Sequence, residues 1–444
     1  MKYKVGLISL GCAKNRVDAE MLLSKIREHG YEIVSNSNDA DAIIINTCGF
    51  IQASKEESIE EIFNTVALKN SPESNLKAVI VTGCLAERYK QQILSEIPEV
   101  DAVVGIGANS KIVEVLNEAL MGKKVEMYES KYNMPLDGSR LQTTPKHYAY
   151  LKIADGCDNR CTYCAIPLIR GNFRSRKMEN VVEEAKSLAD SGVKELLVIA
   201  QDTTRYGEDL YGKLMLVPLL KELCKIDGIK WIRLLYCYPD RITDELLDLM
   251  SKEDKILNYI DLPLQHCSEG ILSKMKRRGN SKSLKKLIDK IREKVKNVVL
   301  RTTFICGFPG ESEENFEELL KFVKEVKFER MGCFSYSREE DTPAYNFPDQ
   351  IDEDEKSKRC DIIMREQMNI MDDYCANQVG KVITVIVDEY DESTGKWFGR
   401  SDADSPDVDG GVIFDAKLKE VEVGSFVDVL ITGYENCDLI GKLV

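Results

Sequence analysis

The stretch Ala154-Asp-Gly-Cys-Asp-Asn-Arg-Cys-Thr-Tyr-Cys164 places three cysteines, Cys157, Cys161 and Cys164, within eight residues. This C-x3-C-x2-C spacing allows one short loop to surround a metal cluster. Thiolates hold iron–sulfur clusters, and a cubane has four corners, so three cysteines leave one iron open to a substrate or cofactor. A structural zinc site usually needs four ligands, and a disulfide needs an oxidising compartment. An iron–sulfur cluster is therefore favoured over structural zinc or inert thiols.

The same loop resembles the radical S-adenosylmethionine (SAM) signature, in which the open iron chelates SAM. Tyr163 occupies the aromatic position that is usual in that signature, just before the last cysteine. Radical chemistry with SAM imposes a recognisable protein frame. The resemblance therefore implies a barrel of parallel strands around the loop, with Tyr163 among the residues that bind the cofactor.

Length and composition limit the class of protein. The chain has 444 residues, 43% of them apolar, which predicts two or three domains with substantial cores. The amino terminus has no signal-peptide pattern, and no window approaches 18 uninterrupted apolar residues, so we expect a cytoplasmic protein without a membrane anchor. Its 14 cysteines then indicate metal or redox chemistry. The net charge of -14 disfavours a nucleic acid as the direct substrate.

Residues 1–125 alternate strand-like and helix-like patterns. Short apolar runs rich in branched residues, separated by helical periods, predict parallel strands with crossover helices and hence an open α/β sheet. The predicted strands are 4–10, 42–46 and 77–82, and the predicted helices begin at Asp18, Ser54 and Glu87.

Each of these three strands is followed by a cysteine, and Cys12, Cys48 and Cys84 recur at intervals of 36 residues. Ligands of open α/β sheets bind beyond the carboxyl ends of the strands, so the three thiols are expected to converge on a second cluster. The alternative is that each cysteine is a small buried hydrophobe. The other eight cysteines show no such spacing, and most are expected to be structural: 224, 237, 267, 306, 333, 360, 375 and 437.

After a predicted linker at 126–146, the region 147–337 contains six further strand patterns with helical periods between them. They predict a partial (β/α)6 barrel with its functional residues at the carboxyl ends of the strands. The three-cysteine loop follows the first of these strands, as that rule requires. The predicted strands are 148–153, 194–200, 231–236, 259–264, 298–305 and 332–336.

Other residues at predicted strand ends are candidates for the site. The sequence Gly307-Phe-Pro-Gly-Glu311 permits close approach of the backbone to a ligand, or is only a tight turn. Its place resembles the SAM-contacting glycine motif of radical-SAM barrels, which implies cofactor binding by Gly307, Gly310 and Glu311. Asp202 and His266 could orient the substrate or carry protons, or be hydrogen-bonded rim residues.

A local basic run follows the cysteine loop: Arg170, Arg174, Arg176 and Lys177. A solvated surface is the default interpretation of such a run, and contact with SAM or with the substrate is the functional alternative.

A connecting helical segment is expected at 338–377, and the tail from 378 to 444 has five short strand patterns joined by Gly and Asp turns. They predict a small OB-like all-β barrel. Barrels of this kind often bind nucleic acid, but this tail carries 14 acidic and six basic residues. A basic protein is the expected partner, and an acidic solvated face is the alternative. Trp397 and Phe398 are candidates for substrate contact or for half-buried core positions.

Taken together, the two three-cysteine sites, the barrel and the tail resemble the radical-SAM methylthiotransferase family over essentially the whole chain, and the tail is similar to its TRAM domain. Within that family several stretches resemble the RimO type, which modifies an aspartate of the twelfth small-subunit ribosomal protein. They are 9–18 (SLGCAKNRVD), 46–51 (NTCGFI), 83–89 (GCLAERY), 201–207 (QDTTRYG) and 399–410 (GRSDADSPDVDG).

The resemblance implies a mechanism with two 4Fe-4S clusters. The cluster on Cys157, Cys161 and Cys164 would cleave SAM to a radical that removes hydrogen from the aspartate β-carbon. The cluster on Cys12, Cys48 and Cys84 would present sulfur, and a second SAM would supply the methyl group. No side chain is singled out as a catalytic acid or base. A flavodoxin or ferredoxin is the expected electron donor. The alternatives are a tRNA adenosine methylthiotransferase and a non-enzymatic two-cluster redox protein.

Overall fold

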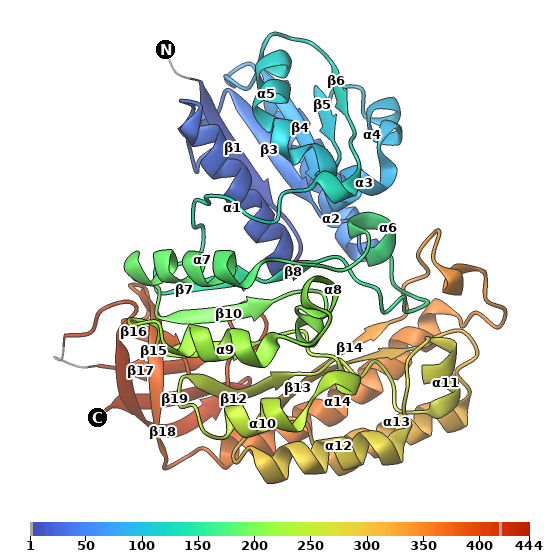
Figure 1. The fold of residues 1–444 in the computed structure, drawn as a ribbon, viewed down its shortest axis with the longest axis vertical. Helices are drawn as coiled ribbons and strands as arrows, with labels where there is room; N and C mark the ends of the chain where they lie inside the picture. Colours follow the sequence, from blue (N-terminus) through green and yellow to red (C-terminus); the bar gives the residue numbers. More distant parts are fainter. Residues whose placement is uncertain (1–2, 417–419) are drawn as a thin grey trace. The chain divides into compact units, whose positions relative to one another are not determined.

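The computed structural model describes residues 3–416 and 420–444, and the chain divides into two compact units. Unit 1 comprises Met1–Thr143, Lys152–Arg176 and Ser337–Asn346. Unit 2 comprises Thr144–Leu151, Lys177–Tyr336 and Phe347–Val444. The three-cysteine loop therefore packs with the amino-terminal part of the chain. Figure 1 labels the elements of both units.

Unit 1 is built on a six-stranded parallel sheet with the strand order β2-β1-β3-β4-β5-β6. The two central strands β3 and β4 are buried along their whole length, which explains their nearly continuous apolar sequence. The strands are β1 (Lys4–Ser9), β2 (Glu32–Ile33), β3 (Ala42–Thr47), β4 (Ala78–Gly83), β5 (Ala102–Val104) and β6 (Val125–Met127).

Helices cover both faces of this sheet. Leu22 and Ile26 of α1 and Val115 of α5 pack on one face, whereas Ile62 of α2 and Ile93 of α4 pack on the other. The predicted open α/β sheet is confirmed, although the helices predicted from Asp18 and Glu87 begin earlier. The helices of unit 1 are α1 (Ala13–Glu28), α2 (Gln52–Lys69), α3 (Cys84–Tyr89), α4 (Gln91–Glu96), α5 (Ile112–Leu120) and α6 (Ile166–Arg170).

Unit 2 contains a second six-stranded sheet, with the order β14-β13-β12-β11-β10-β7. The five neighbouring strands from β10 to β14 run parallel, and β7 at the edge next to β10 completes the six strands that the sequence predicts. The strands are β7 (Tyr148–Lys152), β10 (Glu195–Ile199), β11 (Trp231–Leu234), β12 (Ile256–Asp261), β13 (Val299–Cys306) and β14 (Arg330–Ser335).

The helices of unit 2 follow the strands in alternation. Capping boxes start two of them, because Asn280 and Ser312 each accept a hydrogen bond from the backbone three residues on. In residues 3–416 and 420–444 no helix is both long and apolar enough to cross a membrane. The helices are α7 (Met178–Asp190), α8 (Glu208–Tyr211), α9 (Leu216–Cys224), α10 (Asp244–Met250), α11 (Glu269–Lys274), α12 (Ser281–Lys294), α13 (Glu313–Val326) and α14 (Glu353–Ala376).

The tail of unit 2 forms a closed five-stranded barrel, red in Figure 1, with the order β15-β16-β17-β19-β18. Its core includes Val385, Phe414 and Ile431, and Met371 and Cys375 of α14 pack into the same core. The OB-like barrel predicted for the tail is confirmed. The strands are β15 (Val382–Asp391), β16 (Lys396–Arg400), β17 (Val412–Asp415), β18 (Phe426–Glu435) and β19 (Asp438–Leu443).

Candidate active site

Cys12, Cys48 and Cys84 follow three neighbouring strands of the sheet in unit 1. Cys12 is the N-cap of α1 after β1, Cys48 follows β3, and Cys84 is the first residue of α3 after β4. The strand order reverses between β1 and β3, and ligands of open α/β sheets bind outside the carboxyl ends of strands at such a switch point. The chain topology therefore places the three thiols at the edge of the sheet where a ligand would be held.

Cys48 packs directly against the backbone of Gly11, next to Cys12. Gly11 has a φ of +84°, and a Cβ at that position would lie 2.7 Å from the Cβ and 2.8 Å from the Sγ of Cys48. Cys12 is exposed, whereas Cys48 and Cys84 are 7% and 5% exposed. Burial raises the pKa of the Cys84 thiol to about 12, and the positive charge of Arg170 opposes that increase. A metal that binds there must displace the protons of these thiols.

The loop that carries Cys157, Cys161 and Cys164 is closed at its base by a two-stranded ladder between β8 (Ala154–Asp155) and β9 (Arg174–Ser175). The Cys157 N–H donates to the Gly171 carbonyl at 3.1 Å, and the Cys164 N–H donates to the Cys161 carbonyl at 3.0 Å. Cys161 is buried, and Cys157 and Cys164 are half-buried. The three cysteines therefore lie on a compact, internally bonded loop.

Gly156 and Tyr163 flank these cysteines. Gly156 has a φ of +80°, and a Cβ there would lie 2.1 Å from the carbonyl oxygen of Asn172, so only glycine fits at this position. Tyr163 is half-buried beside Cys164. Its predicted contact with the cofactor stays a prediction.

Arg170 of α6 joins the two cysteine groups within unit 1. Its guanidinium donates to the Asp155 carboxylate at 2.9 and 3.2 Å, lies 2.8 Å from the carboxylate of Asp18, and donates to Cys84 Sγ at 3.7 Å. Ala165 and Ile169 pack directly on Cys84. The loop of one cysteine group thus supplies the charge and the apolar contacts around a cysteine of the other group.

This arrangement corrects the default interpretation for two of the four residues of the basic run, whereas Arg174 is half-buried and Lys177 is exposed. Arg170 and Arg176 are 1% and 4% exposed, so neither belongs to a solvated surface. Arg176 donates to the Asp137 carboxylate at 2.6 Å and to the Lys152 carbonyl at 2.7 Å. The hydrogen-bond partners of both arginines lie far away in the sequence. A local charge pattern therefore cannot predict that these arginines are buried.

The chemistry of the two donor sets fits iron–sulfur clusters. Each set offers three thiols, and each includes at least one that is not fully buried: Cys12 in the first, Cys157 and Cys164 in the second. Three thiolates on a cubane leave one iron without a protein ligand, which is the arrangement that SAM or a sulfur carrier requires.

The Gly307–Glu311 loop lies in unit 2 at the end of β13. Gly307 and Gly310 have φ values of +73° and +76°, so the loop is a tight turn that depends on glycine. The Gly307 N–H donates to the Glu311 carboxylate at 3.0 Å, and Arg359 donates to the same carboxylate at 2.7 Å. Glu311 therefore holds the loop closed, and the predicted contacts of this loop with SAM stay predictions.

Asp202 and His266 are both buried, with exposures of 1% and 0%. Asp202 accepts a hydrogen bond from Thr204 Oγ1 at 2.6 Å, and Arg241 lies 3.2 Å from its carboxylate. His266 Nδ1 accepts a hydrogen bond from the Ser268 N–H at 2.9 Å, and its Nε2 lies 3.5 Å from Glu311. Both side chains therefore have hydrogen-bond partners within the protein, and a role of either one toward the substrate stays a prediction.

Trp397 and Phe398 are both half-buried on β16. Trp397 packs against the barrel core, and its ring lies 4.8 Å from that of Tyr390. A Cβ at Gly411 would lie 2.4 Å from the Phe398 ring, so that ring occupies the space beside this glycine. Both side chains contribute to the barrel, and substrate contact by either one stays a prediction.

Several acidic residues of the tail have partners inside unit 2. The Asp404 carboxylate lies 2.5 Å from the guanidinium of Arg330, Asp409 accepts a hydrogen bond from Tyr259 at 2.6 Å, and Asp388 pairs with His147 at 2.7 Å. The acidic count of the tail therefore overstates its negative surface. The acidic residues that are exposed in the described part are Glu389, Asp391, Glu392, Asp402, Asp407, Asp415, Glu420, Glu422, Asp428 and Glu435.

Three protein families match successive parts of the chain. Residues 4–105 match the Uncharacterized protein family UPF0004, residues 151–323 match the Radical SAM superfamily, and residues 379–444 match the TRAM domain. The segment matched by the Radical SAM superfamily includes both the three-cysteine loop and the Gly307–Glu311 loop.

Full-length relatives share a single name. The chain is 46% identical over 442 residues to the ribosomal protein uS12 methylthiotransferase RimO of Clostridioides difficile, with 99% of each chain covered. It is 48% identical over 442 residues to the protein of that name from Desulforamulus reducens, again with 99% of each chain covered. The protein of that name from Acetivibrio thermocellus is 45% identical, and the alignment covers 100% of this chain and 99% of the relative.

Solved structures with a similar fold are radical-SAM enzymes. The radical SAM methyltransferase TsrM from Kitasatospora setae, with cobalamin and a [4Fe-4S] cluster bound, has a TM-score of 0.57 at 13% identity, covering 78% of this chain and 77% of that one. The radical enzyme OxsB, with SAM and aqua-cobalamin bound, has a TM-score of 0.51 at 14% identity, covering 82% and 56%. At these identities the likeness concerns the fold alone.

Proposed function

We propose that this chain, which belongs to the ribosomal protein uS12 methylthiotransferase RimO family, is a radical-SAM enzyme that methylthiolates the β-carbon of an aspartate in ribosomal protein uS12. One observation carries the proposal: two groups of three cysteines lie in the same compact unit, and Arg170 of one cysteine loop is bonded to Cys84 of the other group. A reaction that cleaves SAM and also forms a carbon–sulfur bond requires two such metal sites.

The cofactors are two 4Fe-4S clusters and SAM. We assign one cluster to Cys157, Cys161 and Cys164 and the other to the group Cys12, Cys48 and Cys84. When bound, the first supplies the electron that cleaves SAM, and the second supplies sulfur.

The protein around the thiols controls their charge. Burial keeps the pKa of the Cys84 thiol at about 12 even though the charge of Arg170 lowers it, so the metal itself must displace the proton. Arg170 stabilises the thiolate once it forms, and the carboxylates of Asp18 and Asp155 hold its guanidinium in place. We propose that Arg170 is a positioning residue that favours the ligand form of Cys84.

For SAM we propose contacts with Tyr163, Gly307 and Gly310. Both glycines have positive φ, and a Cβ at either position would collide with Lys356 or Lys274, so a side chain there would distort the loop. Glu311 supports the loop through its bonds to the Gly307 N–H and to Arg359. Asp202 and His266, and on the barrel Trp397 and Phe398, remain our candidates for contact with the protein substrate.

A basic protein suits the exposed charge of the barrel better than a nucleic acid does. Glu389, Asp391 and Glu392 are exposed at one end of β15, and further exposed carboxylates lie on the other strands and loops of the barrel. Phosphate would be repelled from such a surface, whereas ribosomal proteins, being basic, would be attracted. We propose uS12 as the partner and a flavodoxin or ferredoxin as the electron donor in the cytoplasm.

The division of the chain by function follows the same proposal. Residues 1–125 would form the domain that carries the sulfur-supplying cluster. A linker at 126–146 would lead to the SAM-cleaving barrel at 147–337, which is followed by the connecting helical segment at 338–377 and the TRAM domain at 378–444.

The deciding experiment is mass spectrometry of uS12 from cells that lack the gene, complemented with the wild-type chain or with Cys161→Ala. We expect a methylthio group on one aspartate of uS12 in the wild-type complement and none in the deletion or the variant. Because Cys161 belongs to the SAM-cleaving group alone, the loss would connect the modification to that cluster.

The two alternatives predict different results in the same cells. A tRNA adenosine methylthiotransferase would leave uS12 unchanged and remove methylthioadenosine from tRNA nucleosides. A two-cluster redox protein would change neither, and the purified wild-type chain would then form no 5'-deoxyadenosine from SAM. Either result would overturn the assignment to uS12.

A further inference from the structure

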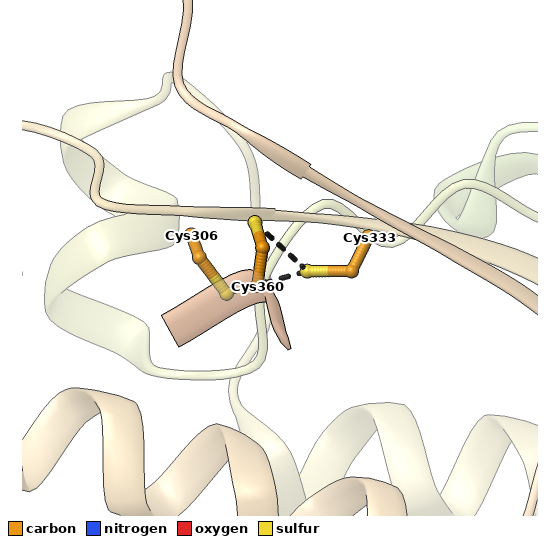
Figure 2. Close-up of side chains that lie close together, drawn as sticks. All are labelled: Cys306, Cys333 and Cys360. Atoms are coloured by element: carbon orange, nitrogen blue, oxygen red, sulfur yellow. Dashed lines mark hydrogen bonds between the residues drawn. The ribbon is translucent and has the colours of Figure 1, made fainter. Parts of the chain in front are cut away.

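Unit 2 contains a third group of three cysteines, which follow one another at intervals of 27 residues. Cys306 ends β13, Cys333 lies in β14, and Cys360 lies in α14. The Sγ atoms of Cys306 and Cys333 are 3.3 Å apart, those of Cys333 and Cys360 are 3.6 Å apart, and all three lie within 4.8 Å of one another. Figure 2 shows the three side chains converging from two strands and one helix.

The fold explains this convergence. Cys333 is paired with Phe304 in the parallel register of β13 and β14, and Cys306 lies two residues beyond Phe304 on the same face of the sheet. Helix α14 packs on both of these strands. Cys360 therefore meets the other two thiols in the layer between the sheet and the helix. Cys306 and Cys360 are buried, and Cys333 is half-buried.

These distances fit one metal ion and not a cubane. With a zinc–sulfur bond of about 2.3 Å, tetrahedral geometry places two ligand sulfurs about 3.8 Å apart. The measured sulfur separations of 3.3 and 3.6 Å are close to that value. In a cubane each cysteine binds a different iron, so the ligand sulfurs must spread around a larger body.

Charge and ligand type select the class of metal. Three thiolates form a soft donor set, which favours zinc or copper(I) over hard cations such as Mg²⁺. A divalent ion with three thiolates has one net negative charge, and a monovalent ion leaves two. Lys356 lies one turn before Cys360 on the same side of α14 and is 2% exposed, whereas its ion-pair partner Glu353 is 77% exposed. Because the Lys356 ammonium is already paired with Glu353, a divalent ion is favoured as the one that leaves the smaller uncompensated charge in this buried site.

We propose that Cys306, Cys333 and Cys360 bind a thiophilic divalent cation, with Zn²⁺ as the expected ion and a water molecule as the fourth ligand on the half-exposed side of Cys333. The ion ties β13, β14 and α14 together. Because Cys306 immediately precedes Gly307, it also anchors the start of the Gly307–Glu311 loop. The site is separate from the six cysteines assigned to iron–sulfur clusters, and it does not depend on the proposed function.

The test uses the full-length holoenzyme with both iron–sulfur clusters filled, so that zinc cannot occupy those cysteines. Zinc chloride is added, loosely bound metal is removed by gel filtration, and zinc and iron are measured by elemental analysis. The variants are Cys333→Ser and Cys360→Ser. Cys224→Ser is the matched control, because Cys224 is also half-buried but belongs to none of the three groups.

We expect one zinc per chain in the wild type and in Cys224→Ser, with zinc-edge X-ray absorption showing three sulfur ligands. Zinc affinity in Cys333→Ser should fall by more than about 100-fold, because even loss of an outer-shell partner costs about 10–100-fold. Iron content should not change. If Cys360→Ser fails to fold, the half-buried Cys333 position still decides the question.

Two results would overturn the proposal. The first is a wild-type holoenzyme that retains no zinc, or retains the same zinc as Cys333→Ser. The second is a disulfide between Cys306 and Cys333 in peptide maps of protein prepared without oxygen, because those sulfurs would then be unable to act as thiolate ligands.

Discussion

The cysteines at the strand ends of unit 1 and the thiol group of unit 2 (Cys306, Cys333 and Cys360) each offer three thiols, but different features of the fold bring them together. In unit 1 each cysteine follows its own strand at a sheet switch point, so the repeat of the fold places the ligands. In unit 2 the cysteines are also evenly spaced, at 27 residues, but they lie on two strands and a helix, so the packing of α14 on the sheet brings them together. Within the described residues, only this second group has all three sulfurs within 4.8 Å of one another.

This difference separates two kinds of metal site. Ligands spread around the edge of a sheet suit a cluster in which each cysteine binds its own iron. Ligands that nearly touch suit one ion. The charges differ as well: Arg170 donates to a cysteine in unit 1, whereas Lys356, one turn before Cys360 in unit 2, is paired with Glu353. The predictions below test these differences, beginning with the largest effect.

Cys161→Ala should reduce the formation of 5'-deoxyadenosine from SAM to background, because it removes one of the three proposed ligands of the SAM-cleaving cluster. The measurement is chromatography of the products after incubation with SAM and a chemical reductant. Cys224→Ser should retain wild-type turnover. Equal turnover in Cys161→Ala and the wild type would contradict the assignment of this loop.

Arg170→Met should lower the free energy of unfolding by about 3–5 kcal/mol, because it leaves the buried carboxylates of Asp18 and Asp155 without their guanidinium partner. Urea unfolding followed by circular dichroism measures the change. Lys123→Met removes an exposed ion pair with Glu118 and should cost only about 0–1 kcal/mol. An equal loss of unfolding free energy in both variants would contradict the expectation that the buried ion pairs of Arg170 stabilise unit 1 more than an exposed pair does.

Gly11→Ala should lower the iron content of the purified protein from about eight toward about four per chain, because the added Cβ would displace Cys48 while the SAM-cleaving loop keeps its ligands. Gly30→Ala is a matched control: its φ of +89° imposes similar backbone strain, but nothing lies within 4 Å of the new Cβ. Iron lost equally from both variants would indicate strain alone, without displacement of a ligand.

Asp388→Asn should lower the free energy of unfolding by about 1.5–3 kcal/mol at neutral pH, the range of a hydrogen bond to a charged group. Burial opposes ionisation of Asp388, but the His147 hydrogen bond and the charge of Arg400 outweigh it and lower its pKa below 3.8. Since the folded-state pKa is lowered, the stabilisation is fully present above the unfolded value of about 3.9 and is lost as the pH falls through the folded value. Urea unfolding at several pH values should therefore show wild type and variant converging below about pH 4. A constant difference across that range would contradict the role of the ionised carboxylate.

Much of the fold followed from local patterns in the chain. The branched apolar runs at residues 42–46 and 77–82 correspond to β3 and β4, because a strand buried on both faces must be apolar throughout. The short strands β2, β5 and β6 were not predicted, because two or three residues carry too little periodicity. The start of α3 at Cys84 was also missed, since helix ends are set by capping geometry and not by the apolar period.

Some candidate residues of the site could be predicted from local spacing in the sequence, and others could not. Spacing alone indicated the six cysteines of the two proposed clusters, because a short loop and a regular βα repeat both translate sequence distance into spatial distance. The burial of Arg170 was not predictable, nor were the ion pairs that connect the tail to the rest of unit 2, because in both cases the partners lie far away in the sequence. Asp404, for example, meets Arg330 from 74 positions away.

The amino-acid order was therefore enough to specify the alternation of strands and helices, the family resemblance and two proposed sets of metal ligands. Which charges became buried, and which of the remaining cysteines met, depended on the packing of β13, β14 and α14 and on the ion pairs of the barrel. The physical reason is range: periodicity and turn chemistry act between near neighbours in the chain, whereas burial and charge pairing act between any groups that the completed fold brings within a few ångströms.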